Sequence, residues 1–454
     1  MRLNKLRKLK SVQDSIYEEN KEQEFISTGV ATLNILFGGG IDKGIPVGKV
    51  SMIAADSSLG KSFIALKIAK NAQTKGKSVI LFDAEKAFNK ALADNLGIQE
   101  NEMLVIQETS LEKVTQQFMN IVDELGEDVK DTMFIIDSWN VLVTSKTIDD
   151  ASAGNDKTDM TTAKKKNTLA KLLLNSGATI FVVNQLYACV NPDTFVKTES
   201  GSKKIGELLL GDKVMTRNGL EPIINKFEYE DAQVYEITLE NGDVIEATGR
   251  HKFVVNGEWK SVEDLIAGDI LSALKIVDIK VKRIPKVVDI ETPSHEYILD
   301  NGVISHNSMD SYSLDSIGGA KGIYYSSSSI VQATSKAKQK ESDGEISGAI
   351  VTAMTRKGRF SREHSKLKYL INYDGGFNAF YGLLDIALEG GYVTKPSAGY
   401  YTRTHINEDK KLREKDIYTE EFWRPIFNDT DFKAYVEKAY SFKHNEINEE
   451  NIEF

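Results

Sequence analysis

Hydrophobic positions in the first half of the chain alternate between short apolar runs and longer segments with helical spacing. The run at 50–55 leads through a polar turn into 63–69, where apolar residues recur with helical periodicity. We expect further strands at 78–82, 103–106, 133–136 and 179–187, and helices at 92–96 and 111–125. Such alternation predicts a mostly parallel sheet with helices on both faces, and ligand sites at the carboxyl ends of its strands.

The pattern changes at residue 189 and remains different as far as residue 307. In segments 213–219, 234–243 and 252–257 apolar and polar residues alternate, which predicts strands. Each segment contains an Asn-Gly pair, which is typical of tight hairpin turns. The sequence therefore predicts an α/β core that is interrupted by an all-β insert.

Composition limits the class of protein. A chain of 454 residues is too long for one ordinary domain, so we expect two or three units. The net charge of −10 argues against a uniformly basic nucleic-acid-binding surface but leaves basic strips at 2–10, 164–166, 336–340 and 356–368. Any one strip also fits a solvated helix face. The sole cysteine, Cys189, excludes an intramolecular disulfide and a Cys-rich zinc site.

A phosphate-binding loop is predicted between the strand at 50–55 and the helix that follows it. Backbone N–H groups and the positive helix end wrap phosphates in such a loop, while its Lys reaches the outer phosphates and its Ser ligates Mg²⁺. Ala55 stands where the pattern has Gly, and an ordinary strand-to-helix turn is the alternative interpretation. The expected ATP-binding residues here are Ala55, Asp56, Ser57, Ser58, Leu59, Gly60, Lys61 and Ser62.

Polar side chains end the other predicted core strands. Asp137 closes an apolar run as a Walker B acid does, so we expect it to support Mg²⁺ together with Ser62. Glu85 follows the strand at 78–82 and is our candidate to orient or deprotonate a water that attacks the γ-phosphate. Gln185 ends the last core strand where an amide can sense that phosphate. The alternatives are a capping or turn role for each acid.

At these spacings, 55–62, 82–85, 135–138 and 183–185 resemble the ATPase core of RecA-type strand-exchange recombinases. Segments 351–359, 372–377, 382–388 and 422–427 resemble more specifically the phage UvsX recombinases. The resemblance implies a RecA-like P-loop ATPase fold, with ATP and Mg²⁺ as cofactors. It makes Glu85 the hydrolytic base and lets Gln185 couple the nucleotide to a DNA-binding loop. Lys357 and Arg359 match the basic pair that reaches a neighbouring subunit's nucleotide.

The same resemblance implies a homo-oligomeric filament on single-stranded DNA, exchange with double-stranded DNA, and phage mediator and single-strand-binding proteins as further partners. Mobile loops at about 145–165 and 308–330 would line the DNA. The residues expected there are Lys164, Lys165, Gly318, Gly319 and Lys321. Seven prolines, no apolar run of membrane length and a polar N-terminus predict an intracellular protein that is neither secreted nor membrane-bound. The resemblance to phage recombinases implies that it is phage-encoded and lies in the host cytoplasm.

The insert resembles an intein of the Hint type. The features that carry this resemblance are a first cysteine, a Thr-x-x-His pattern, an Asp with a later His, and a terminal His-Asn before a nucleophilic Ser. Val288 stands where the family usually has Tyr, and no stretch resembles a homing endonuclease. The residues that match are Cys189, Thr248, His251, Asp289, His295, His306, Asn307 and Ser308.

This resemblance implies self-splicing by a mini-intein, and the alternatives are a buried core cysteine, a turn Asn and unrelated histidines. The expected organisation is an N-terminal oligomerisation segment at 1–25, an ATPase core at 26–188 and 308–390, the insert at 189–307, and a C-terminal region with an acidic tail at 391–454. Two other functions remain open: a RecA-fold helicase or ring ATPase, and a DNA-binding paralogue with weak ATPase activity.

Overall fold

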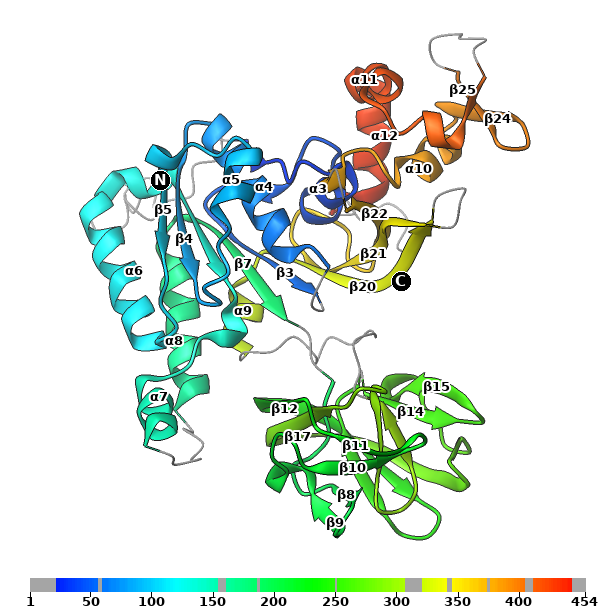
Figure 1. Ribbon diagram of the computed structural model, residues 1–454. Helices are drawn as coiled ribbons and strands as arrows, with labels where there is room; N and C mark the ends of the chain where they lie inside the picture. Colours follow the sequence, from blue (N-terminus) through cyan, green and yellow to red (C-terminus); the bar gives the residue numbers. More distant parts are fainter. Residues whose placement is uncertain are drawn as a thin grey trace, which may run out of the picture.

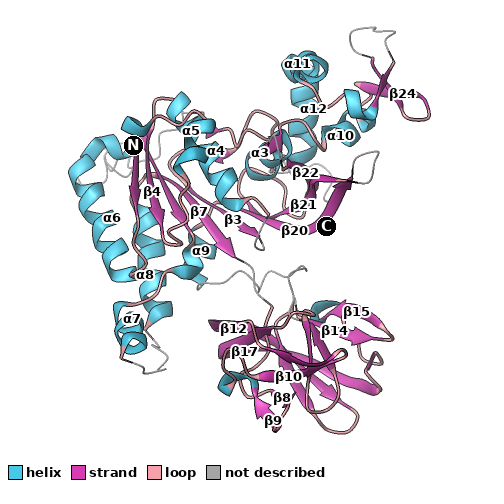
Figure 2. Ribbon diagram, viewed as in Figure 1, coloured by secondary structure: helices cyan, strands magenta, loops and turns pink. Residues whose placement is uncertain are grey.

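The computed structural model describes residues 22–55, 59–153, 161–185, 188–249, 251–306, 321–340, 345–373, 376–404 and 411–442. Within them the chain forms an α/β core and an all-β insert, as predicted (Figures 1 and 2). Most of the expected N-terminal segment and the expected acidic tail lie outside the described residues.

The core is built on a nine-stranded sheet of order β23-β22-β21-β20-β3-β7-β6-β4-β5. From β20 to β5 every neighbouring pair is parallel, whereas β21, β22 and β23 continue the sheet antiparallel beyond β20. The strands are β3 (Val50–Ala55), β4 (Ser78–Asp83), β5 (Met103–Ile106), β6 (Thr132–Asp137), β7 (Thr179–Gln185), β20 (Ser329–Lys340), β21 (Ile346–Gly358), β22 (Lys366–Asn372) and β23 (Gly376–Asn378).

Helices cover both faces of this sheet (Figure 1). Side chains alternate along each buried strand, so Phe181 and Val183 of β7 join one apolar cluster while Ile180 and Val182 join the other. Helices α3 (Ala31–Gly38), α4 (Lys61–Thr74) and α5 (Lys90–Asn95) contribute to the first cluster. Helices α6 (Leu111–Leu125), α8 (Thr162–Asn175) and α9 (Lys321–Ser326) contribute to the second.

The C-terminal region packs onto the first of these clusters. Its buried Trp423, Ile426 and Val436 belong to the same apolar cluster as α3 and α4. Its elements are α10 (Leu383–Glu389), α11 (Glu420–Asn428), α12 (Thr430–Tyr440) and a three-stranded sheet of β24 (Val393–Ser397), β25 (Tyr400–Arg403) and β26 (Leu412–Arg413). A two-stranded sheet of β1 (Phe25–Ile26) and β2 (Ile45–Pro46) flanks α3.

The insert has apolar clusters of its own, separate from those of the core. One sheet has the order β11-β10-β8-β9, and the other has the order β13-β12-β17-β16-β14-β19-β18 with β15 paired to β14. Figure 1 shows the insert beyond the carboxyl end of β7, the strand after which it begins. Its strands are β8 (Phe195–Thr198), β9 (Gly201–Lys204), β10 (Lys213–Thr216), β11 (Gly219–Pro222), β12 (Asn225–Leu239), β13 (Val244–Ala247), β14 (Lys252–Val255), β15 (Glu258–Ser261), β16 (Ile270–Leu271), β17 (Leu274–Glu291), β18 (Glu296–Ile298) and β19 (Ile304–His306).

The three Asn-Gly turns predicted from the sequence are confirmed. They join β10 to β11, β12 to β13 and β14 to β15 as antiparallel hairpins. Their glycines, Gly219, Gly242 and Gly257, have φ of 105°, 90° and 87°, values that a residue with a side chain rarely adopts.

The expectation of two unstructured loops was wrong for much of their length. Within 145–165 the described residues form α7 (Ser145–Ser152) and the start of α8, and within 308–330 they form α9 and the start of β20. Helix α7 was missed because it begins with a cap rather than with apolar periodicity: the hydroxyl of Thr144 accepts the N–H of Thr147. Helix α9 is short and is held by Ile323, which is buried against the second apolar cluster.

Candidate functional site

The first group of site residues lies where β3, β4, β6 and β7 end. Register places Ala55 opposite Gln185 and Asp83 opposite Asp137, so the carboxyl ends of four strands meet at one edge of the sheet. Gly60 follows β3 with φ of 73° and precedes α4, whose first residue, Lys61, is 8% exposed. Asp56, Ser57 and Ser58 lie outside the described residues. The N-terminus of α4 is therefore aimed at the edge where the acids gather.

Ser62 and Asp137 are in contact, as the predicted metal site requires. Burial is the largest influence on Asp137 and raises its pKa to about 6. A hydrogen bond from Ser62 opposes this increase, and the nearby Glu85 adds to it. Oδ1 of Asp137 is buried and has no hydrogen-bond partner among the described residues. A buried carboxylate oxygen without a partner next to a hydroxyl fits an oxygen-binding cation such as Mg²⁺, with water and phosphate oxygens completing the shell.

Glu85 and Gln185 also come together. Nε2 of Gln185 donates to Oε1 of Glu85 at 2.7 Å, and the hydroxyl of Ser138 donates to the same oxygen at 2.5 Å. Nδ2 of Asn140 donates to the carbonyl of Gln185 at 3.0 Å, which fixes the end of β7. The sequence did not single out Ser138, and its only signal was its position directly after Asp137. This carboxylate is held by two donors in the described state.

Lys357 lies on β21, and Arg359 follows directly after that strand. Burial lowers the pKa of Lys357, and the nearby Arg359 lowers it by a smaller amount. Nζ of Lys357 donates to the carbonyls of Tyr324 and Tyr325 in α9, at 2.9 Å each, and lies 5.4 Å from the ring of Tyr324. Arg359 is exposed. In this chain the lysine thus caps α9, while the arginine faces solvent.

The residues expected to bind DNA differ in their surroundings. Lys164 is exposed on α8, whereas Nζ of Lys165 is 2.6 Å from a carboxylate oxygen of Glu112 on α6. Gly318 and Gly319 lie outside the described residues, and Lys321 begins α9. Gly322 of α9 allows close approach to α8, since its N–H donates to Oδ1 of Asn167 at 2.7 Å and a Cβ there would lie 2.4 Å from that oxygen.

The second group of site residues surrounds the peptide bond that begins the insert. The N–H of Cys189 donates to the hydroxyl of Thr248 at 2.9 Å, and the carbonyl of Cys189 accepts the N–H of Thr248 at 2.8 Å. Both side chains are fully buried. Hydrogen bonds between Val190 and Val288 in both directions, at 2.9 Å, hold the next residue beside β17. The bond between Ala188 and Cys189 is therefore fixed in a dry site.

A buried polar chain runs from this bond across the insert. His251 hydrogen-bonds to the backbone of Ala188, and its Nε2 lies 2.5 Å from the hydroxyl of Ser305. Tyr297, opposite Ser305 across the β18–β19 pair, hydrogen-bonds to it and donates its hydroxyl to Oδ1 of Asp289 at 3.1 Å. Tyr297 and Ser305 were not singled out in the sequence, where neither belongs to a recognised pattern.

Burial shifts the pKa values of three groups around this peptide bond. Burial, together with the nearby His306, lowers the pKa of His251 to about 3. Burial raises the pKa of Asp289 well above its usual value, and burial together with Asp289 does the same to the thiol of Cys189. At neutral pH the site therefore holds a thiol and a neutral imidazole beside a carboxyl group whose pKa is raised.

The end of the insert has a different environment. His306 ends β19, and its ring lies edge-on against Trp259 with 4.6 Å between centroids. His295 has a half-exposed side chain whose Nδ1 lies 3.7 Å from Glu291. Asn307 and Ser308 lie outside the described residues. The assignment of His295 to the splicing residues stays a prediction.

Comparison with known proteins matches family models to the first part of the core and to the C-terminal region. Residues 6–202 match the RecA N-terminal domain, and residues 380–436 match the C-terminal domain of the bacteriophage T4 recombination and repair protein, UvsX. This is a UvsX-like chain with a RecA-like core. The all-β insert interrupts that core, so the predicted fold class is confirmed.

Relatives of the UvsX-like chain include cellular and phage proteins. RecA of Mycobacterium leprae is 31% identical over 277 residues, which are 55% of this chain and 38% of that protein. The recombination and repair protein of Enterobacteria phage T4 is 31% identical over 145 residues, 30% of this chain and 36% of that protein. The matched part thus spans little more than a third of each of these relatives. RecA of Colwellia psychrerythraea is 25% identical and is matched over 88% of its length.

Solved intein structures are also similar to part of the chain. The gp41-1 intein is 26% identical, and the match covers 26% of this chain and 98% of that one with a TM-score of 0.25. A DnaB intein from Synechocystis sp. PCC 6803 is 21% identical and covers 27% and 99%, again with a TM-score of 0.25. None of the described helices is long and apolar enough to cross a bilayer.

Proposed function

We propose that this UvsX-like chain is the precursor of an ATP-dependent DNA strand-exchange recombinase, and that residues 189–307 excise themselves by protein splicing. The observation that carries the proposal is the junction after β7. Gln185 contacts Glu85 at the nucleotide edge, and only a few residues later Cys189 begins the buried peptide held by Thr248. Two chemical sites thus follow one another along the chain.

For the ATPase, Lys61 and the N-terminus of α4 would bind the phosphates, and Ser62 and Asp137 would hold Mg²⁺. The metal supplies charge neutralisation of the phosphates when bound. Glu85 would orient the attacking water and accept its proton. In the described state Ser138 and Gln185 both donate to Glu85, and release of that carboxylate by movement of Gln185 would couple the end of β7 to hydrolysis.

The proposed partners are single-stranded DNA, double-stranded DNA and further copies of this chain in a filament. The exposed Lys164 and Arg359 support this assignment, since both present a positive charge at the surface of the core. Lys165 is paired with Glu112, so we assign it a smaller share of DNA binding. Mediator and single-strand-binding proteins remain proposed partners on the basis of the resemblance alone.

For splicing, the thiol of Cys189 would attack the carbonyl carbon of Ala188. The C–S bond forms as the C–N bond breaks, and the leaving nitrogen of Cys189 takes up the proton that the sulfur loses. Thr248 already contacts that nitrogen, and His251 contacts the backbone of Ala188. Asp289, whose charge interacts with the thiol of Cys189, would assist the acyl transfer to the hydroxyl of Ser308.

The last steps would remove the insert from the chain. The side-chain nitrogen of Asn307 attacks its own carbonyl carbon, the bond to Ser308 breaks, and the freed amine of Ser308 gains a proton. The ester between Ala188 and Ser308 then rearranges to a peptide bond. Because each bond that forms replaces one that breaks, the sequence needs no external energy source.

Intact-mass measurement of the full chain from a recombinant host tests the splicing proposal. We expect two species, one lacking residues 189–307 and one with the mass of that segment. A single species of unchanged mass under all pH and reducing conditions would refute it. Strand exchange and DNA-stimulated phosphate release are then compared between the spliced product and a Cys189→Ala, Asn307→Ala precursor, which we expect to be much less active.

The same assays separate the two alternatives. Rings rather than filaments, seen by negative-stain microscopy with DNA and an ATP analogue, would favour another kind of RecA-fold ATPase. DNA-stimulated phosphate release that is lost in Lys61→Ala would argue against a paralogue with decayed ATPase activity.

A further inference from the structure

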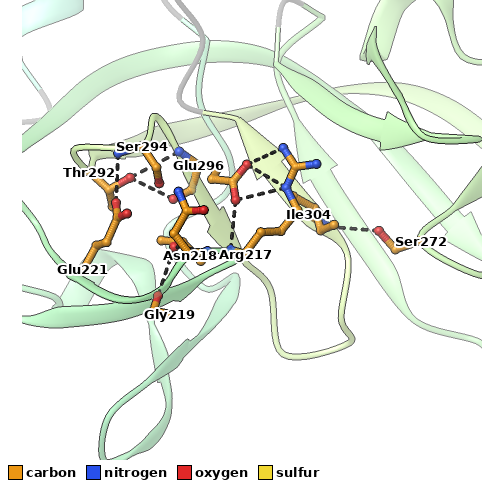
Figure 3. Close-up of polar contacts among 10 residues, drawn as sticks. Arg217, Asn218, Gly219, Glu221, Ser272, Thr292, Ser294, Glu296 and Ile304 are labelled. Carbon is orange, nitrogen blue, oxygen red and sulfur yellow. Dashed lines mark hydrogen bonds and ion pairs between the residues drawn. The ribbon is translucent and has the colours of Figure 1, made fainter.

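A buried glutamate pairs with a half-exposed arginine beside His306, the next-to-last residue of the insert. Glu296 is 4% exposed, yet its carboxylate accepts the backbone N–H of Arg217 at 2.9 Å and three side-chain hydrogen bonds from the same arginine at 2.5 to 3.0 Å (Figure 3). A buried carboxylate is costly unless it is paired, and Arg217 supplies the pairing in a bidentate geometry.

The backbone on both sides of this pair is fixed as well. The N–H of Glu296 donates to the hydroxyl of Thr292 at 3.2 Å, and that hydroxyl donates to the carbonyl of Glu296 at 2.8 Å (Figure 3). The N–H of Ile304, the first residue of β19, donates to Ser272 at 3.2 Å. Strand β18 is thus held at the end that pairs with His306, and β19 is held at its first residue, which pairs with Ile298.

Glu296 faces His306. The two residues are direct partners in the antiparallel pair of β18 and β19, and their charges interact. Arg217 also lies over the ring of Trp259 at 5.4 Å, and Trp259 is in edge-on contact with His306. The side-chain contacts thus run from Glu296 through Arg217 and Trp259 to His306, and the register of β18 and β19 places Glu296 and His306 opposite each other.

The charges around His306 come from four elements. Glu296 on β18 favours an imidazolium. Three other residues oppose an imidazolium at His306. They are Lys252 on β14, which pairs with His306, His251, whose pKa His306 lowers, and Arg217, which lies behind Glu296. Hydrogen bonds from Arg217 outweigh the effect of burial on Glu296 and lower the pKa of its carboxyl, so the charge nearest His306 is negative.

We propose that Glu296, clamped by Arg217, is a positioning residue that holds and electrostatically supports the His306 ring for cleavage of the peptide bond after Asn307. This inference rests on the splicing function proposed above. His306 passes a proton to the amine of Ser308 as the bond breaks, while the attacking nitrogen of Asn307 loses one, so the proton balance closes. Glu296 acts through the imidazole of His306.

The test isolates this step in the full chain. A Cys189→Ala background cannot form the thioester, so release of the fragment that begins at Ser308 reports cleavage after Asn307 alone. In that background we expect Glu296→Gln to slow release about tenfold and to move the high-pH limb of its pH profile down by about one unit. Glu296→Asp should restore the profile in part.

Glu221→Gln is the matched control. Glu221 lies in the same polar cluster and accepts the N–H of Ser294 at 2.8 Å (Figure 3). Within the described part of the chain it makes no hydrogen bond or ion pair with His306. We expect it to leave the pH profile unchanged. A profile for Glu296→Gln equal to that of Glu221→Gln would overturn the inference, whereas absence of cleavage in the Cys189→Ala parent would overturn the splicing proposal itself.

A second readout does not depend on the cleavage rate. The chain has six histidines, so the NMR titration of His306 can be assigned by its loss in His306→Ala. We expect the titration midpoint of His306 to fall by about one unit in Glu296→Gln in the Cys189→Ala, Asn307→Ala precursor. An unchanged midpoint would refute the electrostatic role even if the cleavage rate had fallen.

Discussion

Replacing Thr248 by Val tests the assignment of the first splicing step. The change keeps the shape of the side chain but removes the hydroxyl that accepts the N–H of Cys189 at 2.9 Å. As the carbonyl of Ala188 is attacked, the Cys189 nitrogen becomes a basic leaving group, and a hydroxyl already in contact with it can supply a proton. The hydroxyl should therefore matter more in the transition state than in the resting state.

The magnitude follows from two opposing costs. A buried N–H left without a partner destabilises the resting state by about 1–3 kcal/mol. Loss of a preorganised hydrogen-bonding group typically costs the transition state about 3–4 kcal/mol. The difference raises the barrier by about 2 kcal/mol, which is about 30-fold in rate. The free energy of unfolding of the insert should fall by about 1–3 kcal/mol.

The assay is thiol-induced cleavage before Cys189 in the full chain carrying Asn307→Ala, followed by mass spectrometry. Thr216→Val is the matched control, because Thr216 is equally buried in the insert and donates to the carbonyl of Gly219 at 2.9 Å, far along the chain from the junction. A Thr248→Val precursor that cleaves as fast as the Thr216→Val precursor would show that the hydroxyl only stabilises the resting state.

Two further predictions concern the nucleotide site. Because burial raises the pKa of Asp137 to about 6, metal binding must expel a proton below that pH. The affinity for Mg²⁺ and an ATP analogue, measured by fluorescence titration, should therefore fall about tenfold per pH unit below pH 6. In Asp137→Asn the affinity should be low and independent of pH. Gly60 has φ of 73°, and in Gly60→Ala the new Cβ would lie 2.7 Å from the ring of Phe377. Gly76 has a similar φ of 75° but nothing within 4 Å of a Cβ, so Gly60→Ala should lower the melting temperature and the nucleotide affinity more than Gly76→Ala does. Equal effects would mean that backbone strain alone matters.

Much of the fold was readable from local pattern. Apolar runs and helical spacing located β3 to β7 and α6, and Asn-Gly pairs located three hairpins of the insert, because each depends on a few neighbouring residues. Strands β20 to β23 were not predicted. Acids and amides that directly follow buried strands pointed to one edge of the sheet, since the carboxyl ends of parallel strands meet there. The contact of Ser62 with Asp137 and that of Glu85 with Gln185 follow from this rule.

Tertiary structure decided which ordinary polar residues join the sites. Ser138, Tyr297 and Ser305 carry no motif, and they become buried hydrogen-bonding partners only when distant strands pair. Glu296 and Arg217 lie 79 residues apart in the sequence, so no local pattern connects them. The sequence by itself determined the types and positions of the reactive groups; long-range strand pairing determined their burial and charge, because desolvation and partner charges exist only in the folded chain.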